Sequence, residues 1–225
     1  MKIFSPLSLI LTLVLSSCVS ENENWKNREL SAELLHEATK NLTDIMVHDI
    51  FSPPVSSRIY AYSSIAAREV MAHKDDEEAS LAGQLNGLEF VPEPENPEAI
   101  SFELAALKAY NSVGKTMIFS EDKMDAFVLE SEKKLKQAFP KSVWNASMAY
   151  GEVVASAILA WANEDNYKET RSYPKFSVLP SPGRWQPTPP AYMDGIEPHW
   201  SKIRPFLLDS ASQFVPAPPP PFSME

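Results

Sequence analysis

Residues 142–163 read SVWNASMAYGEVVASAILAWAN, and this stretch decides the fold class. Its apolar side chains recur at spacings of three and four residues, which is the repeat of an α-helix. They form one broad face that is strongly apolar and rich in aromatic rings. The members of that face are Val143, Ala146, Tyr150, Val153, Val154, Ala157, Ile158 and Trp161. The stretch therefore predicts a long helix that packs against other helices.

The chain before this helix shows the same periodicity in shorter segments. Ser52 followed by Pro53 and Pro54 is a helix start, because Ser suits the N-cap and Pro suits the first turn. Ser120 precedes a second start, and Pro140 ends the helix that follows it. No window shows the sustained alternation of a strand. We expect an all-α fold, a helical bundle of about six helices within residues 25–166. Their expected ranges are 30–46, 53–70, 79–85, 98–117, 120–139 and 142–163.

Residues 167–225 have a different composition. Thirteen of the twenty prolines lie after Tyr167, so the segment has little room for long helices. Disordered linkers are poor in aromatic residues. This segment keeps Tyr173, Phe176, Trp185, Tyr192, Trp200, Phe206 and Phe214. We expect an ordered, extended arm rich in Pro and aromatic residues that is laid over the helices, with polyproline II conformation over residues 216–221.

The first residues have the pattern of an export signal. One Lys, a short apolar run and small residues precede Cys18, and the run is too short to span a bilayer. Residues 15–18, Leu-Ser-Ser-Cys, resemble the bacterial lipobox, in which the Cys carries the lipid. We expect a signal peptide over 1–17, lipidation of Cys18 and a polar tether over 18–24. This predicts a bacterial protein exported and lipid-anchored to a membrane, at its periplasmic face or at the cell surface. The alternative is an ordinary cleaved signal with an incidental Cys.

Charge and motifs exclude several classes of function. The net charge is −10 and no run of Lys or Arg could neutralise successive phosphates, so we expect no nucleic-acid partner. His36-Glu37 begins like a zinc-protease motif, but Lys40 stands where the second His is needed. No Gly-x-Ser-x-Gly elbow and no Gly-rich phosphate loop is present. We therefore assign no catalytic residue and no metal ligand.

Two stretches, 49–62 and 183–206, are dense in polar and aromatic residues. One interpretation is the wall of a pocket for an anion or a small polar ligand, since Arg binds such groups through several N–H donors. The other is a helix start and a rigid packed arm, in which each Arg binds backbone carbonyls. The candidate wall residues are Arg58, Tyr60, Arg184, Trp185, His199 and Trp200.

A family resemblance rests on the same two stretches. The segment SPPVSSRIYAY at 52–62, the turn Asp165-Asn166-Tyr167 and the segment GRWQPTPP at 183–190 resemble the N-terminal half of vanadium-dependent haloperoxidases. These enzymes belong with the type 2 phosphatidic acid phosphatase superfamily. The resemblance implies an all-α fold. It also implies that vanadate or phosphate is held by three motifs in a C-terminal half: a Lys with Arg-Pro seven positions later, Ser-Gly-His, and Arg followed by Gly-x-His.

None of those three motifs occurs in this chain. The only Arg-Pro is Arg204-Pro205, where Glu197 stands in place of the Lys, and no Gly begins a Gly-His or a Gly-x-His sequence. We expect the N-terminal portion of an exported haloperoxidase- or acid-phosphatase-like lipoprotein that is inactive alone. Vanadate would be the cofactor of the complete enzyme, not of this chain. Residues 167–225 would lead into a missing C-terminal catalytic half.

The expected partners are the membrane, through the lipid, and a second chain that carries the C-terminal half if the enzyme is split. Apolar faces meant for the missing helices would then be exposed. The alternative function is a non-catalytic surface lipoprotein that binds a glycan or another small polar ligand.

Overall fold

The protein is all-α in its computed structural model, which describes residues 25–26, 28, 30–74, 79–181, 183–217 and 220. No strand occurs among these residues, which confirms the predicted fold class. Cys18, the signal peptide and the tether lie outside the described residues. The α-helices are α2 (Glu33–His48), α3 (Pro53–Ala72), α4 (Phe102–Thr116), α5 (Glu121–Leu135), α6 (Lys141–Asn163) and the short α7 (Tyr167–Thr170). Single 3-10 turns form η1 (Pro97–Ala99), η2 (Lys136–Ala138) and η3 (Trp200–Lys202).

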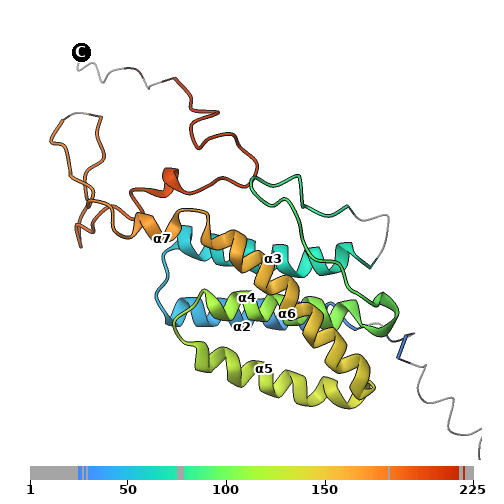
Figure 1. Ribbon diagram of the computed structural model, residues 1–225. Coiled ribbons are helices and arrows are strands. Elements are labelled where there is room, and N and C mark those ends of the chain that lie inside the picture. The colour runs from blue at the N-terminus through green and yellow to red at the C-terminus, as the bar shows by residue number, and fades with distance from the viewer. Residues whose placement is uncertain are drawn as a thin grey trace, which may run out of the picture.

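Helix α4 lies at the centre of the bundle. It contacts α2, α3, α5 and α6, and α6 crosses the other helices at a steep angle (Figure 1). Most positions of α4 are buried, including Tyr110 and Val113. The largest buried side chains of the other helices include Leu42, Tyr62 and Ile158. Most of the apolar face predicted for 142–163 is thus in the core, but Ala146 and Ala157 are half-buried and Val153 is exposed.

The start of α4 differs from the prediction. Residues 97–99 form the separate turn η1, and α4 begins at Phe102 instead of near Glu98. Ser101 is its N-cap, because its Oγ accepts a hydrogen bond from the N–H of Leu104 at 3.4 Å. α3 begins at Pro53 as predicted, but the hydroxyl of Ser52 does not cap the helix and is buried with no hydrogen-bond partner among the described residues.

The N-terminus of α5 is capped from another helix. Ser120 was expected to cap it, yet the Ser120 side chain accepts no such bond. Instead Asp49, at the end of α2, accepts from the N–H of Phe119 at 2.9 Å and of Ser120 at 3.0 Å. The hydroxyl of Ser120 also donates to Asp49, at 2.5 Å. One carboxylate therefore ties the α2–α3 connection to the start of α5.

Replacing Asp49 with Ala is expected to destabilise the protein by about 1 kcal/mol at pH 7, the usual loss for a helix cap. Burial raises the pKa of Asp49, but the hydrogen bonds from Ser120 and Phe119 outweigh it and lower the pKa overall. A lowered native pKa means that the contribution is complete above the unfolded pKa and is lost as the pH falls through the native pKa. Urea unfolding should therefore show a difference between wild type and Asp49→Ala that narrows from pH 7 to pH 3. Asp44→Ala, at an exposed position of α2, is the control.

The helix predicted over 79–85 is wrong, since this segment forms successive turns. Its backbone is held by Glu69 of α3, a fully buried carboxylate that accepts from the Ser80 hydroxyl at 2.5 Å and the Leu81 N–H at 2.8 Å. Gly83 and Gly87 have φ of +75°, a left-handed conformation that Gly adopts without strain. A long-range side-chain contact overrides the local helical pattern here.

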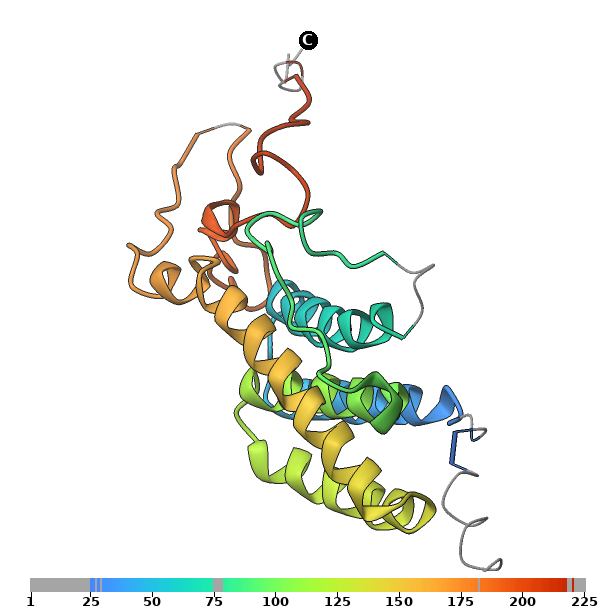
Figure 2. The same ribbon diagram turned by 45° about the vertical axis from the view of Figure 1, so that its right-hand side comes forward.

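The arm lies against the bundle along only part of its length. Most residues from Ser172 to Pro198 are exposed, and this stretch forms a loop that projects from the helices (Figures 1 and 2). The chain returns at η3, and Trp200 and Phe206 pack against the core. The last described residues, beyond Ala211, then run away from the bundle (Figure 1). The expected coverage of the helices by the arm is correct for 200–206 and wrong for 172–198.

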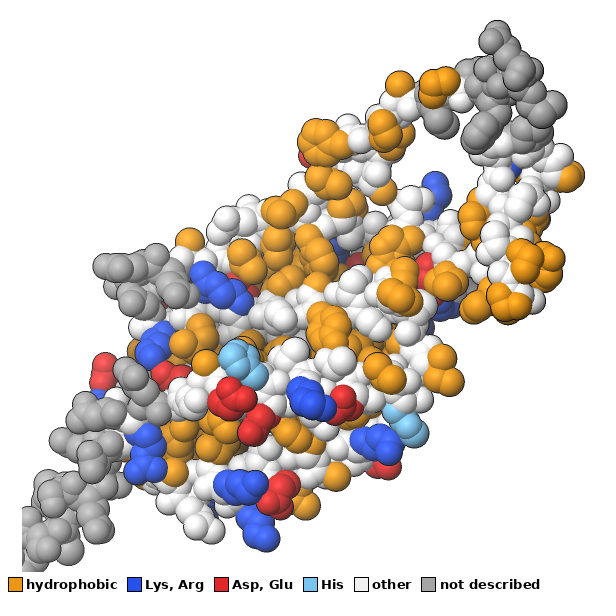
Figure 3. Space-filling model, turned by 180° about the vertical axis from the view of Figure 1, so that it is seen from behind, with side chains coloured by type: hydrophobic (Ala, Val, Ile, Leu, Met, Phe, Trp, Pro, Cys, Tyr) orange, Lys and Arg blue, Asp and Glu red, His pale blue; other side chains and the backbone are white. Residues whose placement is uncertain are grey.

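Many large apolar side chains are exposed. Figure 3 shows hydrophobic side chains over the arm and the adjoining surface, while charged side chains gather over the opposite part of that face. The side chains exposed by about 70% or more include Val47, Ile50, Phe90, Phe119, Leu129, Leu207 and Phe214. None of the described helices is both long and apolar enough to cross a bilayer.

Candidate functional site: the cleft between α3, α6 and the arm

A cleft of about 590 Å³ opens where three parts of the chain meet. α3 contributes Arg58 and Tyr62, and the turn after α6 contributes Asp165. The returning arm supplies the remaining wall, from Trp200 to Ala211. The cleft thus contains residues from both stretches, 49–62 and 183–206, that are dense in polar and aromatic residues.

Its polar centre is a buried ion pair. Nε of Arg58 lies 2.6 Å from Oδ2 of Asp165, and Asp165 is 1% exposed. The same oxygen accepts from the Tyr62 hydroxyl at 2.9 Å, and Oδ1 accepts from the N–H of Tyr167 at 2.8 Å. The Arg58 guanidinium also donates to the carbonyl oxygen of Ala162 at 3.1 Å. Each carboxylate oxygen has a donor, as a buried charge requires.

Aromatic rings complete the surroundings of Arg58. The carbon of its guanidinium lies 4.9 Å from the ring centre of Tyr62 and 4.4 Å from that of Tyr167. Cation–π contacts of this kind gain strength when water is excluded. Burial and the charge of Asp165 raise the pKa of Tyr62. The phenol therefore stays protonated and acts as a hydrogen-bond donor.

A second arginine fastens the arm. The backbone N–H of Arg204 donates to the carbonyl oxygen of Asp165 at 2.9 Å, and its Nη2 donates to that of Trp161 at 2.8 Å. Its guanidinium stacks on the Trp161 ring and passes close to Gly87, where an added Cβ would lie 3.1 Å from Nη1. Gly87 thus leaves room for this side chain.

Asn86 holds the next residues of the arm. Its backbone N–H donates to the carbonyl oxygen of Phe206 at 2.9 Å, and its side-chain amide donates to that of Pro205 at 3.0 Å. The indole N–H of Trp161 in turn donates to the carbonyl oxygen of Asn86 at 3.0 Å. The side-chain amide of Asn86 also donates to the carbonyl oxygen of Leu208 at 2.8 Å. The arm is therefore fixed to α6 and to the 79–91 segment over residues 204–208.

The six residues predicted as one pocket wall do not share a wall. Arg58 and Trp200 line the cleft, but the hydroxyl of Tyr60 pairs with that of Thr43, at 2.6 Å. His199 contacts the carbonyl oxygen of Pro174 through Nε2, at 2.7 Å.

The other two members of the predicted wall lie in the projecting loop. Arg184 is exposed, and Trp185 packs edge-on against Phe176. Trp185 lines a different hollow, of about 600 Å³. The alternative interpretation, with arginines bound to backbone carbonyls, describes both Arg58 and Arg204.

The arrangement does not fit an oxyanion such as vanadate or phosphate. The guanidinium of Arg58 is committed to Asp165 and Ala162, and Nη2 of Arg204 is committed to Trp161. Nε of Arg204 is buried and has no hydrogen-bond partner among the described residues. The carboxylate of Asp165 would repel an anion in this cleft. Among the described residues, no group of three or more His, Cys, Asp or Glu is arranged to hold a metal ion.

Comparisons with known proteins identify the family. No protein-family model matches the chain, and no curated protein matches it. The chain shares 51% sequence identity with a bacterial vanadium-dependent iodoperoxidase, and it superposes on the crystal structure of that protein with a TM-score of 0.81. The match covers 88% of this chain and 48% of that one, so this chain spans about half the length of the iodoperoxidase. The shared sequence and helical architecture place the chain in the vanadium haloperoxidase superfamily.

Proposed function

We propose that this chain is the N-terminal helical portion of a haloperoxidase- or phosphatase-type enzyme whose oxyanion-holding residues lie outside it. The observation that carries the proposal is the half-length match to an iodoperoxidase, combined with the absence of the three oxyanion motifs from this sequence. Vanadate would be bound by the complete enzyme. This chain would supply a scaffold and no catalytic group.

The fixed arm supports a scaffold role. Residues 204–206 are held by Asp165, Trp161 and Asn86, so the chain leaves the bundle in one direction. The exposed Leu207 follows directly, and the exposed Phe214 and Val215 lie further along the arm. A second half that packed on this surface would bury them, whether it continues the same chain or belongs to another one.

The proposed location rests on the sequence alone. Residues 1–17 would direct export, and lipid on Cys18 would hold the protein at the bacterial membrane, on its periplasmic face or at the cell surface. Labelling of cells with a tagged fatty acid tests this proposed lipid attachment, since Cys18→Ala should abolish labelling of the protein.

The first test of activity uses the chain alone. With orthovanadate, peroxide and iodide or bromide, we expect no halide oxidation above background, and no hydrolysis of p-nitrophenyl phosphate. Turnover by a clean preparation would refute the proposal, because it would require an active site within these residues.

A chimera supplies the positive test. Residues 30–217 of this chain replace the matching segment of the iodoperoxidase, and iodide oxidation is measured with orthovanadate. We expect activity to be retained, because about half of the residues are identical and the helices superpose. A chimera that folds by circular dichroism yet does not oxidise iodide would contradict the scaffold role.

One feature supports the alternative function, a non-catalytic surface lipoprotein that binds a glycan. Trp185 is 49% exposed and lines the hollow in the projecting loop, where a sugar ring could stack on it. Saturable quenching of tryptophan fluorescence by a glycan, lost in Trp185→Ala, together with an inactive chimera, would favour this alternative.

A further inference from the structure

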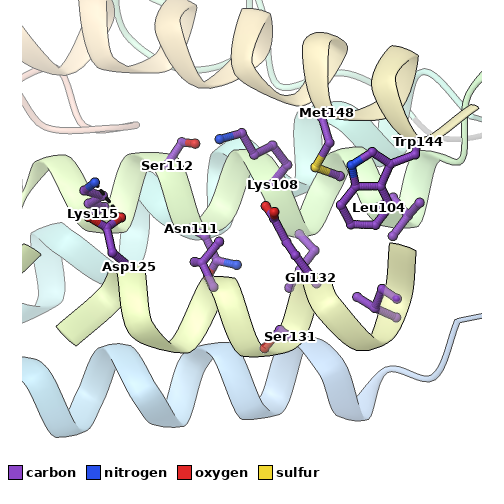
Figure 4. A pocket seen from close by; sticks show the side chains of 13 residues that line it. Leu104, Lys108, Asn111, Ser112, Lys115, Asp125, Ser131, Glu132, Trp144 and Met148 are labelled. Carbon is purple, nitrogen blue, oxygen red and sulfur yellow. Dashed lines mark hydrogen bonds and ion pairs between the residues drawn. The ribbon is translucent and has the colours of Figure 1, made fainter. Parts of the chain in front are cut away.

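A second cavity lies between α4, α5 and α6, away from the cleft. Its volume is about 110 Å³, room for several water molecules or a ligand of a few heavy atoms. In Figure 4 the side chains of Lys108 and Asn111 from α4 and of Glu132 from α5 approach the same space. Trp144 and Met148 of α6 form an apolar end.

Asn111 is a buried amide whose hydrogen bonding is incomplete. It is 6% exposed, and its Oδ1 is buried without a hydrogen-bond partner in the part of the chain that the structure describes. A buried polar atom without a partner is destabilising, and native proteins contain few of them. Because Asn111 lines the cavity, a ligand there could donate to Oδ1.

One carboxylate that lines the cavity has no ion-pair partner among the described residues. Lys108 pairs with Glu152 at 3.0 Å, and Lys115 pairs with Asp125 at 2.5 Å. Glu132 makes no ion pair or side-chain hydrogen bond with any residue that the structure describes. The lining thus offers two unused acceptors, one neutral and one negative, on opposite helices.

We infer that this cavity binds a small primary ammonium cation. Its N–H groups donate to the Glu132 carboxylate and to Oδ1 of Asn111, and its short alkyl group lies against Met148 and Trp144. The ammonium group provides three donors, and the Trp ring attracts cations. An anion would meet Glu132, and the described residues hold no metal-binding group here. The inference is independent of the function proposed above.

Titration of the ¹⁵N-labelled full chain with ethylammonium chloride tests the site by NMR. We expect saturable shifts of the Asn111 side-chain amide and the Trp144 indole, with a Kd on the order of millimolar for a ligand of three heavy atoms. Tetramethylammonium chloride, which has no N–H donor, and sodium chloride should give no saturable shift.

Glu132→Gln should weaken binding at least about tenfold, since it removes the charge that assists the hydrogen bond. Glu130→Gln is the matched control and should leave the Kd unchanged. Glu130 lies two residues before Glu132 on α5, and it pairs with Lys134. Equal shifts with tetramethylammonium, no saturation, or an unaffected Glu132→Gln would each overturn the inference and leave a cavity that holds water only. The comparison of cations uses wild-type protein, so it decides the question even if a variant fails to fold.

Discussion

Replacing Arg58 with Met is expected to lower the free energy of unfolding by about 3–5 kcal/mol, the usual effect of removing one partner from a buried ion pair. Met keeps the aliphatic volume of the side chain, so the change isolates the loss of charge and hydrogen bonds. The Asp165 side chain, which is 2% exposed, would lose its charged partner, and its remaining donors, Tyr62 and the N–H of Tyr167, carry no net charge. Urea unfolding followed by circular dichroism measures the loss.

A second change separates the charge from the packing. In Arg58→Met with Asp165→Asn, the amide oxygen can still accept one hydrogen bond while no charge is buried, so we expect part of the lost stability to return. Lys134→Met breaks the exposed pair with Glu130 and should cost at most about 0.5 kcal/mol. If Arg58→Met destabilised the protein no more than this control, the ion pair would not contribute to holding α3 against the turn after α6.

The fold was predictable wherever local pattern and tertiary packing agree. The periodicity of 142–163 placed α6 to within a residue, and the pair Pro53-Pro54 placed the start of α3. The errors arose where distant side chains hold the backbone. Glu69 binds the 80–81 turn from α3, and Asp49 caps α5 from the end of α2. No spacing within a segment reveals such contacts.

The site was predictable in part for the same reason. Arg58 was singled out by its polar and aromatic neighbours, but its partner Asp165 lies 107 residues further along the chain. A signal existed within α3: Arg58 and Tyr62 are four residues apart and therefore share one helix face. The projecting loop could not be predicted, because its aromatic residues suggest packing that the described part of the chain does not provide.

Replacing Gly151 with Ala is the second change for which we expect a large effect on stability. Whether it stabilises or destabilises the protein shows which contribution is larger, helix propensity or packing. Helix propensity alone would make the change stabilising by about 1 kcal/mol, since Gly is a poor residue in the middle of a helix. Packing opposes this. A Cβ at Gly151 of α6 would clash with the carbonyl oxygen of Ala105 and lie 2.8 Å from Cβ of Lys108, both on α4.

Because the first contact is with backbone, relief requires α4 and α6 to move apart, and these two helices carry much of the core. Overpacking of this kind typically costs about 1–3 kcal/mol and at times more, so we expect a net loss of about 2 kcal/mol in urea unfolding. Asn145→Ala, at an exposed position of the same helix, tests propensity without the clash and should be neutral or slightly stabilising. A stabilised Gly151→Ala would show that α4 and α6 have room to separate, and that close approach at Gly151 does not fix their crossing.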